Sequence, residues 1–149
     1  MLKQGDKAPD FELKDGDGKT HKMSDYKGTL VVYFYPRDDT PGCTIEAIEF
    51  KDKYPEFQKK EVDILGVSPD NMESHQKFTN KYSLPFPLLA DIENKLSKAY
   101  SVYEKKRFMG REFLGIIRST FIINNGKIVK VFPKVTPKGH AKMILEALE

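Results

Sequence analysis

Residues 29–47, with the sequence TLVVYFYPRDDTPGCTIEA, are the stretch that decides the fold of this chain. The stretch begins with an unbroken run of β-branched and aromatic residues, which is typical of a strand buried on both faces. Pro36 ends this strand. After a polar loop, Thr40 suits the N-cap of a helix and Pro41 suits its first residue, so Cys43 falls in the first helical turn. The stretch therefore predicts a strand, a loop and a helix that begins beside a thiol.

The rest of the chain continues this alternation of strands and helices. Apolar runs and helical spacing predict strands at 62–68, 88–91, 118–124 and 127–132 and helices at 71–82, 94–100 and 137–148. The dipeptide Asn125-Gly126 is a strong hairpin signal between the last two strands. Pro55 should kink the helix that contains Cys43, or split it in two. Residues 101–117 are polar, basic and punctuated by glycine, which predicts an ordered loop or a loose hairpin.

The order of these elements predicts an α/β protein with a thioredoxin-like fold. Two strand–helix crossovers followed by an antiparallel hairpin give a central mixed sheet with helices on both faces. Alternating residues at 8–13 and a turn sequence at 15–18 add an N-terminal β-hairpin. Sheets of this kind place ligand sites at the carboxyl ends of their strands, and Cys43 follows such an end.

Length and composition predict one soluble domain over residues 1–149. Hydrophobic residues make up 39% of the chain and charged residues 32%, which is the composition of a globular protein. The net charge of +3 is spread along the sequence without a basic block, so nucleic acid is not an expected partner. No apolar segment has the length of a membrane span, and the N-terminus lacks a signal-peptide pattern, so we expect no membrane partner and a cytoplasmic location.

Cys43 is the only cysteine in the sequence, so it has no partner for an internal disulfide. A thiol at a helix N-terminus lies near unpaired amides and the positive end of the helix dipole, which favour the reactive thiolate. Asp38 and Asp39 oppose a thiolate unless their carboxylates point away. The residues alone leave a second interpretation open, in which Cys43 is a small buried hydrophobe without reactivity.

The spacing of Pro36, Thr40 and Cys43 resembles the active-site motif of the peroxiredoxins, in which a proline and a threonine or serine precede the reactive cysteine. Residues 40–47 are similar to the peroxiredoxin Q branch, also called bacterioferritin comigratory protein. Further segments that match the branch occur in the same order as in its members, at residues 5–11, 66–68, 85–91 and 118–123. The resemblance implies the thioredoxin fold and a thiol-dependent peroxidase. Such an enzyme reduces hydrogen peroxide and organic hydroperoxides through a sulfenic acid on Cys43.

The resemblance also implies a role for each residue of the site. Cys43 is the nucleophile, and the guanidinium of Arg118 favours its thiolate and holds a peroxide oxygen. The Thr40 hydroxyl orients the substrate, because it can donate and accept hydrogen bonds. Pro36 shields the thiolate from water. The role expected of Glu46 comes from its position instead: it is three residues after Cys43 on the same helix face, where it would orient Arg118.

The residues by themselves also allow purely structural roles for the two charged side chains. Arg118 is then an exposed strand charge, or an ion-pair partner of Glu46 or Asp91. Glu46 is then a favourable carboxylate in the first helical turn. The three histidines, His21, His75 and His140, are far apart in the sequence, which gives little support to a cysteine–histidine hydrolase. No set of residues has metal-ligand spacing, and the sequence implies no cofactor.

The sequence departs from the branch at the resolving cysteine, which many members carry five residues after the first. Here that position is Ile48. We therefore predict a one-cysteine cycle in which an external thiol reduces the sulfenic acid, supplied by thioredoxin, glutaredoxin or a small thiol. Replacement of a natural cysteine by engineering would also account for Ile48. A monomer is favoured, and a dimer stays open.

Two functions of other classes remain as alternatives. The first is a peroxide-sensing thiol protein, which would react with peroxide but turn over poorly with every reductant. The second is a non-catalytic thioredoxin-fold binding module, whose thiol would not react at all. A thiol–disulfide oxidoreductase is less well supported, because the sequence contains no pair of cysteines.

Overall fold

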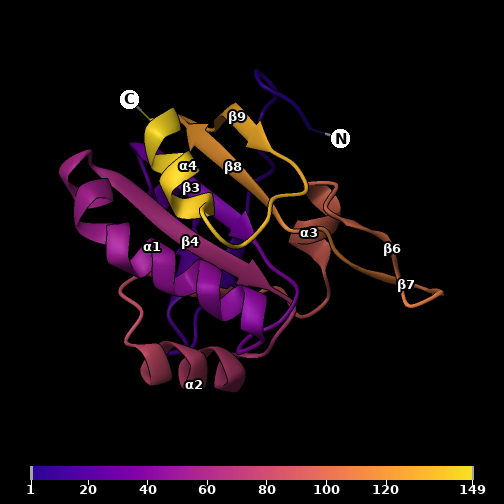
Figure 1. The fold of residues 1–149 in the computed structure, drawn as a ribbon. Helices are drawn as coiled ribbons and strands as arrows, with labels where there is room; N and C mark the ends of the chain where they lie inside the picture. Colours follow the sequence, from indigo (N-terminus) through magenta and orange to yellow (C-terminus); the bar gives the residue numbers. More distant parts are fainter. Residues whose placement is uncertain (1, 149) are drawn as a thin grey trace.

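A computed structural model describes residues 2–148 of the chain (Figure 1). Its strands are β1 Glu12–Lys14, β2 Thr20–Lys22, β3 Thr29–Phe34, β4 Val62–Ser68, β5 Leu88–Ala90, β6 Tyr103–Phe108, β7 Arg111–Ile116, β8 Ser119–Asn124 and β9 Lys127–Phe132. Its helices are α1 Pro41–Lys59, α2 Met72–Tyr82, α3 Lys95–Ala99 and α4 His140–Ala147, with a 3₁₀ turn at Met23–Asp25. The central sheet has the strand order β5-β4-β3-β8-β9. β3, β4 and β5 run parallel to one another. β8 runs antiparallel to both of its neighbours, β3 and β9, so the sheet is mixed.

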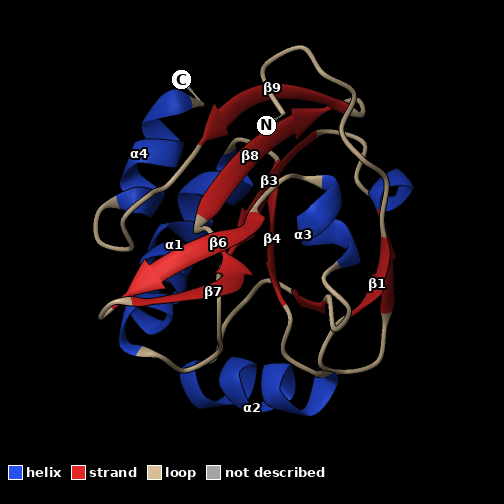
Figure 2. Ribbon diagram, turned by 90° about the vertical axis from the view of Figure 1, so that its right-hand side faces the viewer, coloured by secondary structure: helices blue, strands red, loops and turns tan. Residues whose placement is uncertain are grey.

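The central strand β3 is buried on both faces, as its sequence predicts, and it separates two apolar layers. One layer contains Val31, Tyr33 and Tyr35 together with residues of α1, α2 and α4. The other contains Leu30, Val32 and Phe34 together with residues of α3 and the N-terminal segment. This alternation follows from the two-residue period of a strand. Figure 2 shows the result, with α1 and α4 on one face of the sheet and α3 on the other.

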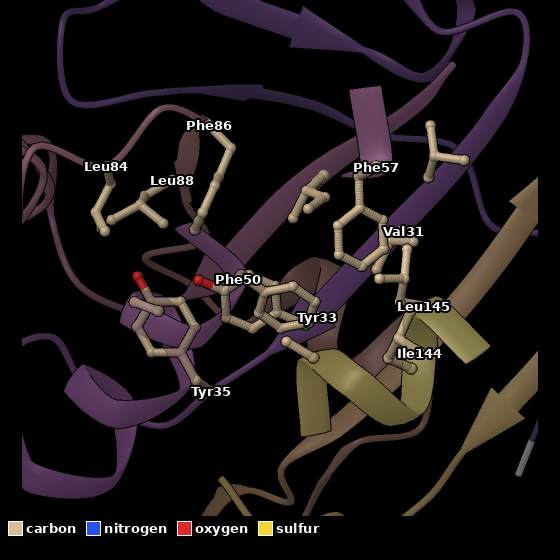
Figure 3. Packing of buried hydrophobic residues seen from close by; sticks show 14 of the residues in the cluster. Val31, Tyr33, Tyr35, Phe50, Phe57, Leu84, Phe86, Leu88, Ile144 and Leu145 are labelled. Carbon is tan, nitrogen blue, oxygen red and sulfur yellow. The ribbon is translucent and has the colours of Figure 1, made fainter. Parts of the chain in front are cut away.

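Aromatic packing fixes α1 against β3. The ring of Phe50 on α1 stacks on Tyr33 of β3 with a centroid distance of 4.7 Å, and both side chains are fully buried (Figure 3). Phe57, near the end of α1, packs on Phe50 at 5.9 Å. Aromatic pairs of this kind add about 0.5–1.5 kcal/mol beyond the area that they bury. The first turn of α1, which carries Cys43, is therefore held at the carboxyl end of β3.

The predicted fold class is confirmed, including the mixed sheet, the helices on both faces and the hairpin β1–β2. For residues 101–117 the sequence predicts an ordered loop or a loose hairpin. They form a hairpin, because β6 and β7 pair in regular antiparallel register. Of the two effects predicted for Pro55, the split is wrong, since α1 continues from Pro41 to Lys59, and the kink stays a prediction. Phe50 and Phe57 are buried on either side of this proline, and their packing outweighs the loss of one backbone hydrogen bond.

The closing helix begins later than its predicted start at Pro137. α4 starts at His140, and Gly139 before it has a φ of 81°. This left-handed conformation is open to glycine and interrupts a right-handed helix. Within residues 2–148, no helix has both the length and the apolar composition needed to span a membrane.

Candidate active site

Cys43 lies in the first turn of α1, as the sequence predicts. Thr40 is the N-cap and has an extended backbone, and Pro41 is the first helical residue. The first hydrogen bond of the helix joins the Thr44 N–H to the Thr40 carbonyl at 2.8 Å. The Cys43 N–H precedes that bond, so it belongs to the amides that a helix start leaves without an intrahelical acceptor. The Cys43 side chain is buried, with 1% of the residue exposed.

The sheet brings Arg118 to Cys43 across 75 positions of sequence. Ser119, the first residue of β8, pairs with Phe34, the last residue of β3. Because the strands are antiparallel, the residue before β8 lies where β3 ends and the loop to α1 begins. The Arg118 Nη2 donates to the Cys43 Sγ at 3.3 Å, and its Nη1 donates to the Glu46 Oε1 at 2.7 Å. One guanidinium therefore bridges the thiol and a carboxylate on the same helix face.

Burial sets the electrostatics of this triad. The side chain of Arg118 is 15% exposed and that of Glu46 is 0% exposed. Burial raises the pKa of Glu46 to about 7, although the positive charge of Arg118 opposes the shift. Burial also works against the charge of Arg118, but Glu46 and Cys43 outweigh it and raise the pKa of the guanidinium. Arg118 is thus a permanent cation, whereas Glu46 changes its charge near neutral pH.

The carboxylates of the two loop aspartates are engaged by other side chains. Asp38 accepts from the hydroxyl of Tyr35 at 2.6 Å and lies 2.7 Å from His75. Asp39 accepts from Lys81 at 2.8 Å and from the Tyr82 hydroxyl at 3.0 Å. Both carboxylates therefore have partners on other side chains.

Thr40 and Pro36 occupy the loop that leads to Cys43. The Thr40 hydroxyl donates to the Arg37 carbonyl at 3.0 Å and makes no capping hydrogen bond to the helix, although its backbone conformation is that of an N-cap. Pro36 is half-buried directly after Tyr35. The structure thus places both residues on the segment of Cys43, and their roles toward a substrate stay predictions.

Asp91, the alternative partner of Arg118, is engaged elsewhere. Its carboxylate accepts the backbone N–H groups of Leu96 and Ser97 at 3.0 and 2.9 Å and thereby holds the start of α3. The ion pair of Arg118 with Glu46 does exist, at 2.7 Å, but the same guanidinium also contacts Cys43. The ion-pair interpretation and the predicted position beside the thiol are therefore both correct.

The structure adds Lys106 and His140 to the surroundings of the site, which the sequence did not suggest. Burial, and then Arg118, lower the pKa of Lys106, whose Nζ donates to the Ile116 carbonyl at 2.9 Å. Burial, and then Arg118, lower the pKa of His140 to about 4, so its imidazole is neutral at pH 7. Neither residue lies in a recognisable motif, because the folding of β6–β7 and α4 onto the body brings them here.

Gly42 gives Arg118 the room to reach the thiol. A Cβ at this position would lie 3.1 Å from the Cγ of Pro137 and 3.3 Å from the Nη2 of Arg118, which is tighter than most Cβ contacts, so these side chains would have to shift. The sequence does contain a signal for this residue, since a glycine directly before a nucleophile indicates a close approach.

The geometry and the fold together define a class of protein. A thioredoxin-like sheet that carries a thiol at a helix N-terminus, with a buried guanidinium against its sulfur, is the framework of a protein with a reactive, nucleophilic cysteine. The comparison with family models matches residues 4–132 to the AhpC/TSA family. The chain belongs to this family.

Individual relatives place the chain within the family. It is 49% identical to peroxiredoxin Bcp of Bacillus subtilis over 97% of this chain and 94% of that protein. The solved bacterioferritin comigratory protein of Xanthomonas campestris is 40% identical, with a TM-score of 0.88 over 93% of this chain and 89% of that one. PrxQ of Xylella fastidiosa is 35% identical, with a TM-score of 0.94 over 99% and 96%. The chain is thus a one-cysteine peroxiredoxin of the Q branch and a thiol-dependent peroxidase, and the binding-module and sensor alternatives are not favoured.

The first prediction concerns Gly42. We expect Gly42→Ala to displace the guanidinium of Arg118 from the sulfur and to slow the reaction of Cys43 with hydrogen peroxide by roughly tenfold to a hundredfold. The measurement is the second-order rate constant of thiol loss in a stopped-flow experiment. The matched control is Gly28→Ala, whose added Cβ would meet only the Glu61 carbonyl oxygen, at an ordinary 3.5 Å. Equal rates for the two variants would contradict the steric argument.

The second prediction concerns the pH dependence of stability. The pKa of Glu46 is raised in the folded state from 4.5 to about 7, so its stabilising contribution is complete below pH 4.5 and is lost as the pH rises to about 7. Compared with Glu46→Gln, the native protein should therefore lose roughly 2–3 kcal/mol of unfolding free energy across this interval. Urea denaturation of both proteins over a pH series measures the difference. A difference that is independent of pH would show that Glu46 does not titrate as described.

Proposed function

We propose that Cys43, Arg118, Thr40, Pro36 and Glu46 form the catalytic machinery of this peroxidase. In its first step, the Cys43 thiolate attacks the terminal oxygen of a hydroperoxide. A sulfur–oxygen bond forms, the O–O bond breaks, and its electron pair leaves on the second oxygen. A proton converts this oxygen to water or to an alcohol, and Cys43 is oxidised to a sulfenic acid.

One observation carries the proposal, namely the contact of the Arg118 guanidinium with the Cys43 sulfur at 3.3 Å. A cation at this distance stabilises the thiolate, and the guanidinium has further N–H donors that can stabilise the charge on the leaving oxygen. Glu46 fixes the other edge of the guanidinium at 2.7 Å and orients it. The Cys43 N–H, which precedes the first helical hydrogen bond, supplies a further donor.

Thr40 and Pro36 complete the proposed site from the loop. The Thr40 hydroxyl uses its hydrogen on the Arg37 carbonyl, so its oxygen lone pairs remain to accept the O–H of a hydroperoxide. Pro36 has no backbone N–H to bind water and shields the sulfur on this side. These roles come from the resemblance to the peroxiredoxin motif and are compatible with the observed positions.

We propose that an external thiol completes the cycle. The sulfenic acid reacts with this thiol to give a mixed disulfide and water, and a second thiol then releases Cys43 in its reduced form. Solved structures of the Xanthomonas campestris peroxiredoxin Q include serine mutants at two separate cysteine positions. This chain has Cys43 alone, with Ile48 at the position five residues further on. Thioredoxin, glutaredoxin and small thiols are the candidate reductants.

Reduction requires Cys43 to become accessible, because only 1% of the residue is exposed. A peroxide is small enough to reach the sulfur through a narrow opening, whereas a protein thiol is not. We infer that the loop before α1, or its first turn, moves away from Arg118 before the mixed disulfide forms.

The remaining parts of the proposed function concern substrate, assembly and location. One solved relative is described as having alkyl peroxide reduction activity, which supports organic hydroperoxides as substrates beside hydrogen peroxide. We propose that residues 1–149 act as a single domain and a monomer in the cytoplasm. The two apolar layers share one sheet, which supports the single domain.

The third prediction tests the site. One equivalent of hydrogen peroxide should convert Cys43 to a sulfenic acid that dimedone traps and mass spectrometry detects. Cys43→Ser should abolish peroxide consumption, and Arg118→Ala should slow the reaction by about a hundredfold or more, as for other losses of a charge-stabilising donor. The control is Arg107→Ala, because Arg107 forms an exposed ion pair with Glu112 on the surface of β6–β7.

Turnover separates the proposal from its alternatives. With excess thioredoxin, glutaredoxin or dithiothreitol, the oxidised protein should return to the thiol and consume further peroxide. Equal peroxide consumption by Cys43→Ser would refute the assignment of the nucleophile. Fast oxidation without reduction by any of the three thiols would instead support a peroxide sensor.

A further inference from the structure

A second cluster of buried polar side chains lies behind the loop that carries Cys43. Asp38 is in the middle of this loop, between β3 and α1, and His75 is on α2. The Nδ1 of His75 lies 2.7 Å from the Oδ2 of Asp38, and the two side chains are 0% and 3% exposed. The Nε2 of His75 lies 2.9 Å from the Leu89 carbonyl on β5. His75 thus connects the loop with the sheet.

The protons of this cluster can be assigned from the acceptors. A carbonyl oxygen only accepts hydrogen bonds, so the Nε2 of His75 carries a proton and donates it to Leu89. The Nδ1 of His75 and the Oδ2 of Asp38 share a second proton, because two lone pairs at 2.7 Å would repel each other. The pair therefore has no net charge, which permits its complete burial.

Further hydrogen bonds fix Asp38 from several elements. The hydroxyl of Tyr35 donates to its Oδ1 at 2.6 Å, and the hydroxyl of Ser74 donates to its Oδ2 at 2.8 Å. The backbone N–H of Asp38 donates to Asp70 at 2.7 Å. Burial, and then the charge of Asp38, raise the pKa of Tyr35 well above its usual value, so Tyr35 remains a donor. Both the side chain and the backbone of Asp38 are therefore held in place.

These side chains form a hydrogen-bonded network, and their contacts do not favour a metal site. Ligand atoms of Asp38, Asp70 and His75 lie within 4.8 Å of one another. Both ring nitrogens of His75, however, already face protein oxygens at hydrogen-bond distance. A metal ion would have to displace Asp38 from the Nδ1.

The network acts on Cys43 through a short piece of chain. Two residues after Asp38, Thr40 forms the N-cap of α1, and its carbonyl accepts the first helical hydrogen bond. The hydroxyl of Thr40 also donates back to Arg37, next to Asp38. A shift of Asp38 therefore shifts the start of α1, and with it the distance from the Cys43 sulfur to Arg118.

We propose that His75 is a positioning residue, which holds the loop of residues 35–43 closed through Asp38. The strength of this contact then sets the relative rates of the peroxide step and the reduction step. The proposal rests on the proposed function. In the closed loop Cys43 contacts Arg118 and reacts with peroxide, whereas reduction by an external thiol requires the loop to open. A weaker His75–Asp38 contact lowers the population of the closed loop and raises that of the open one.

Two substitutions of His75 separate its two hydrogen bonds. The amide nitrogen of asparagine occupies nearly the place of the histidine Nδ1, and that of glutamine nearly the place of the Nε2. His75→Asn therefore keeps the bond to Asp38 and loses the bond to Leu89, whereas His75→Gln does the reverse. Single-turnover experiments follow oxidation of Cys43 by hydrogen peroxide and reduction of its sulfenic acid by reduced thioredoxin, a protein thiol that requires the open loop. Thermal unfolding reports the stability of each variant.

For His75→Gln we expect oxidation to be about tenfold slower and reduction several-fold faster than in the native protein. His75→Asn should restore most of the native oxidation rate. Glu73→Gln, an exposed change on the same helix that removes a surface ion pair with Lys77, should change neither rate. A merely structural role of His75 predicts that both variants lose stability and that neither shows opposite changes in the two steps.

Equal rates for His75→Gln and His75→Asn, or slowing of both steps together, would overturn the proposal. If His75→Gln does not fold, Tyr35→Phe takes its place, since it removes one donor from Asp38 and leaves His75 intact. Opposite changes in the two rates are then required of Tyr35→Phe, and unchanged rates overturn the proposal. Failure of the native protein to form a sulfenic acid would refute the proposed function itself, independently of these variants.

Discussion

The contact of the Arg118 guanidinium with both the Cys43 sulfur and the Glu46 carboxylate is the interaction on which the proposed site depends. It requires β8 to lie antiparallel beside β3, so that the residue before β8 meets the end of β3. It also requires α1 to begin there, with Glu46 one turn after Cys43 and a glycine at position 42. The aromatic packing of α1 on β3 keeps these conditions together, because it fixes the helix relative to the sheet.

The sequence predicts the local parts of this arrangement well and the long-range parts poorly. The apolar run of β3, the cap at Thr40 and the turn at Asn125-Gly126 act over a few residues, so pattern alone locates them. Pairing of Arg118 with Cys43 is set by strand order, and only the resemblance to a known family anticipated it. The burial of His75 and the direction in which Asp38 points depend on packing between α2 and the loop. The helical spacing of Met72, His75 and Phe78 does place His75 on the apolar side of its helix, but residue type and spacing contain no signal for the direction of Asp38.

Buried charge on the two sides of the Cys43 loop is balanced in different ways. Behind the loop, Asp38 and His75 share a proton and form a pair without net charge. In front of it, Arg118 is a permanent cation between two acids, one of which has a pKa of about 7. The rear pair is suited to hold a fixed conformation. The front triad is suited to chemistry, because its charge changes as Cys43 passes from thiolate to sulfenic acid.

Because the chain has a single cysteine, noncovalent contacts alone control the opening of the Cys43 loop, whereas a two-cysteine protein can also use a disulfide. An internal disulfide would hold the oxidised loop open by a covalent bond until a reductant arrives. With Ile48 in that position, the proposed cycle has no such covalent trap, so the open loop persists only as long as its free energy permits. Noncovalent contacts of the loop must then be strong enough to place Cys43 against Arg118, yet weak enough to release it within a catalytic turnover. Asp38, which is held by hydrogen bonds with Tyr35, Asp70 and Ser74, is where the structure sets that balance.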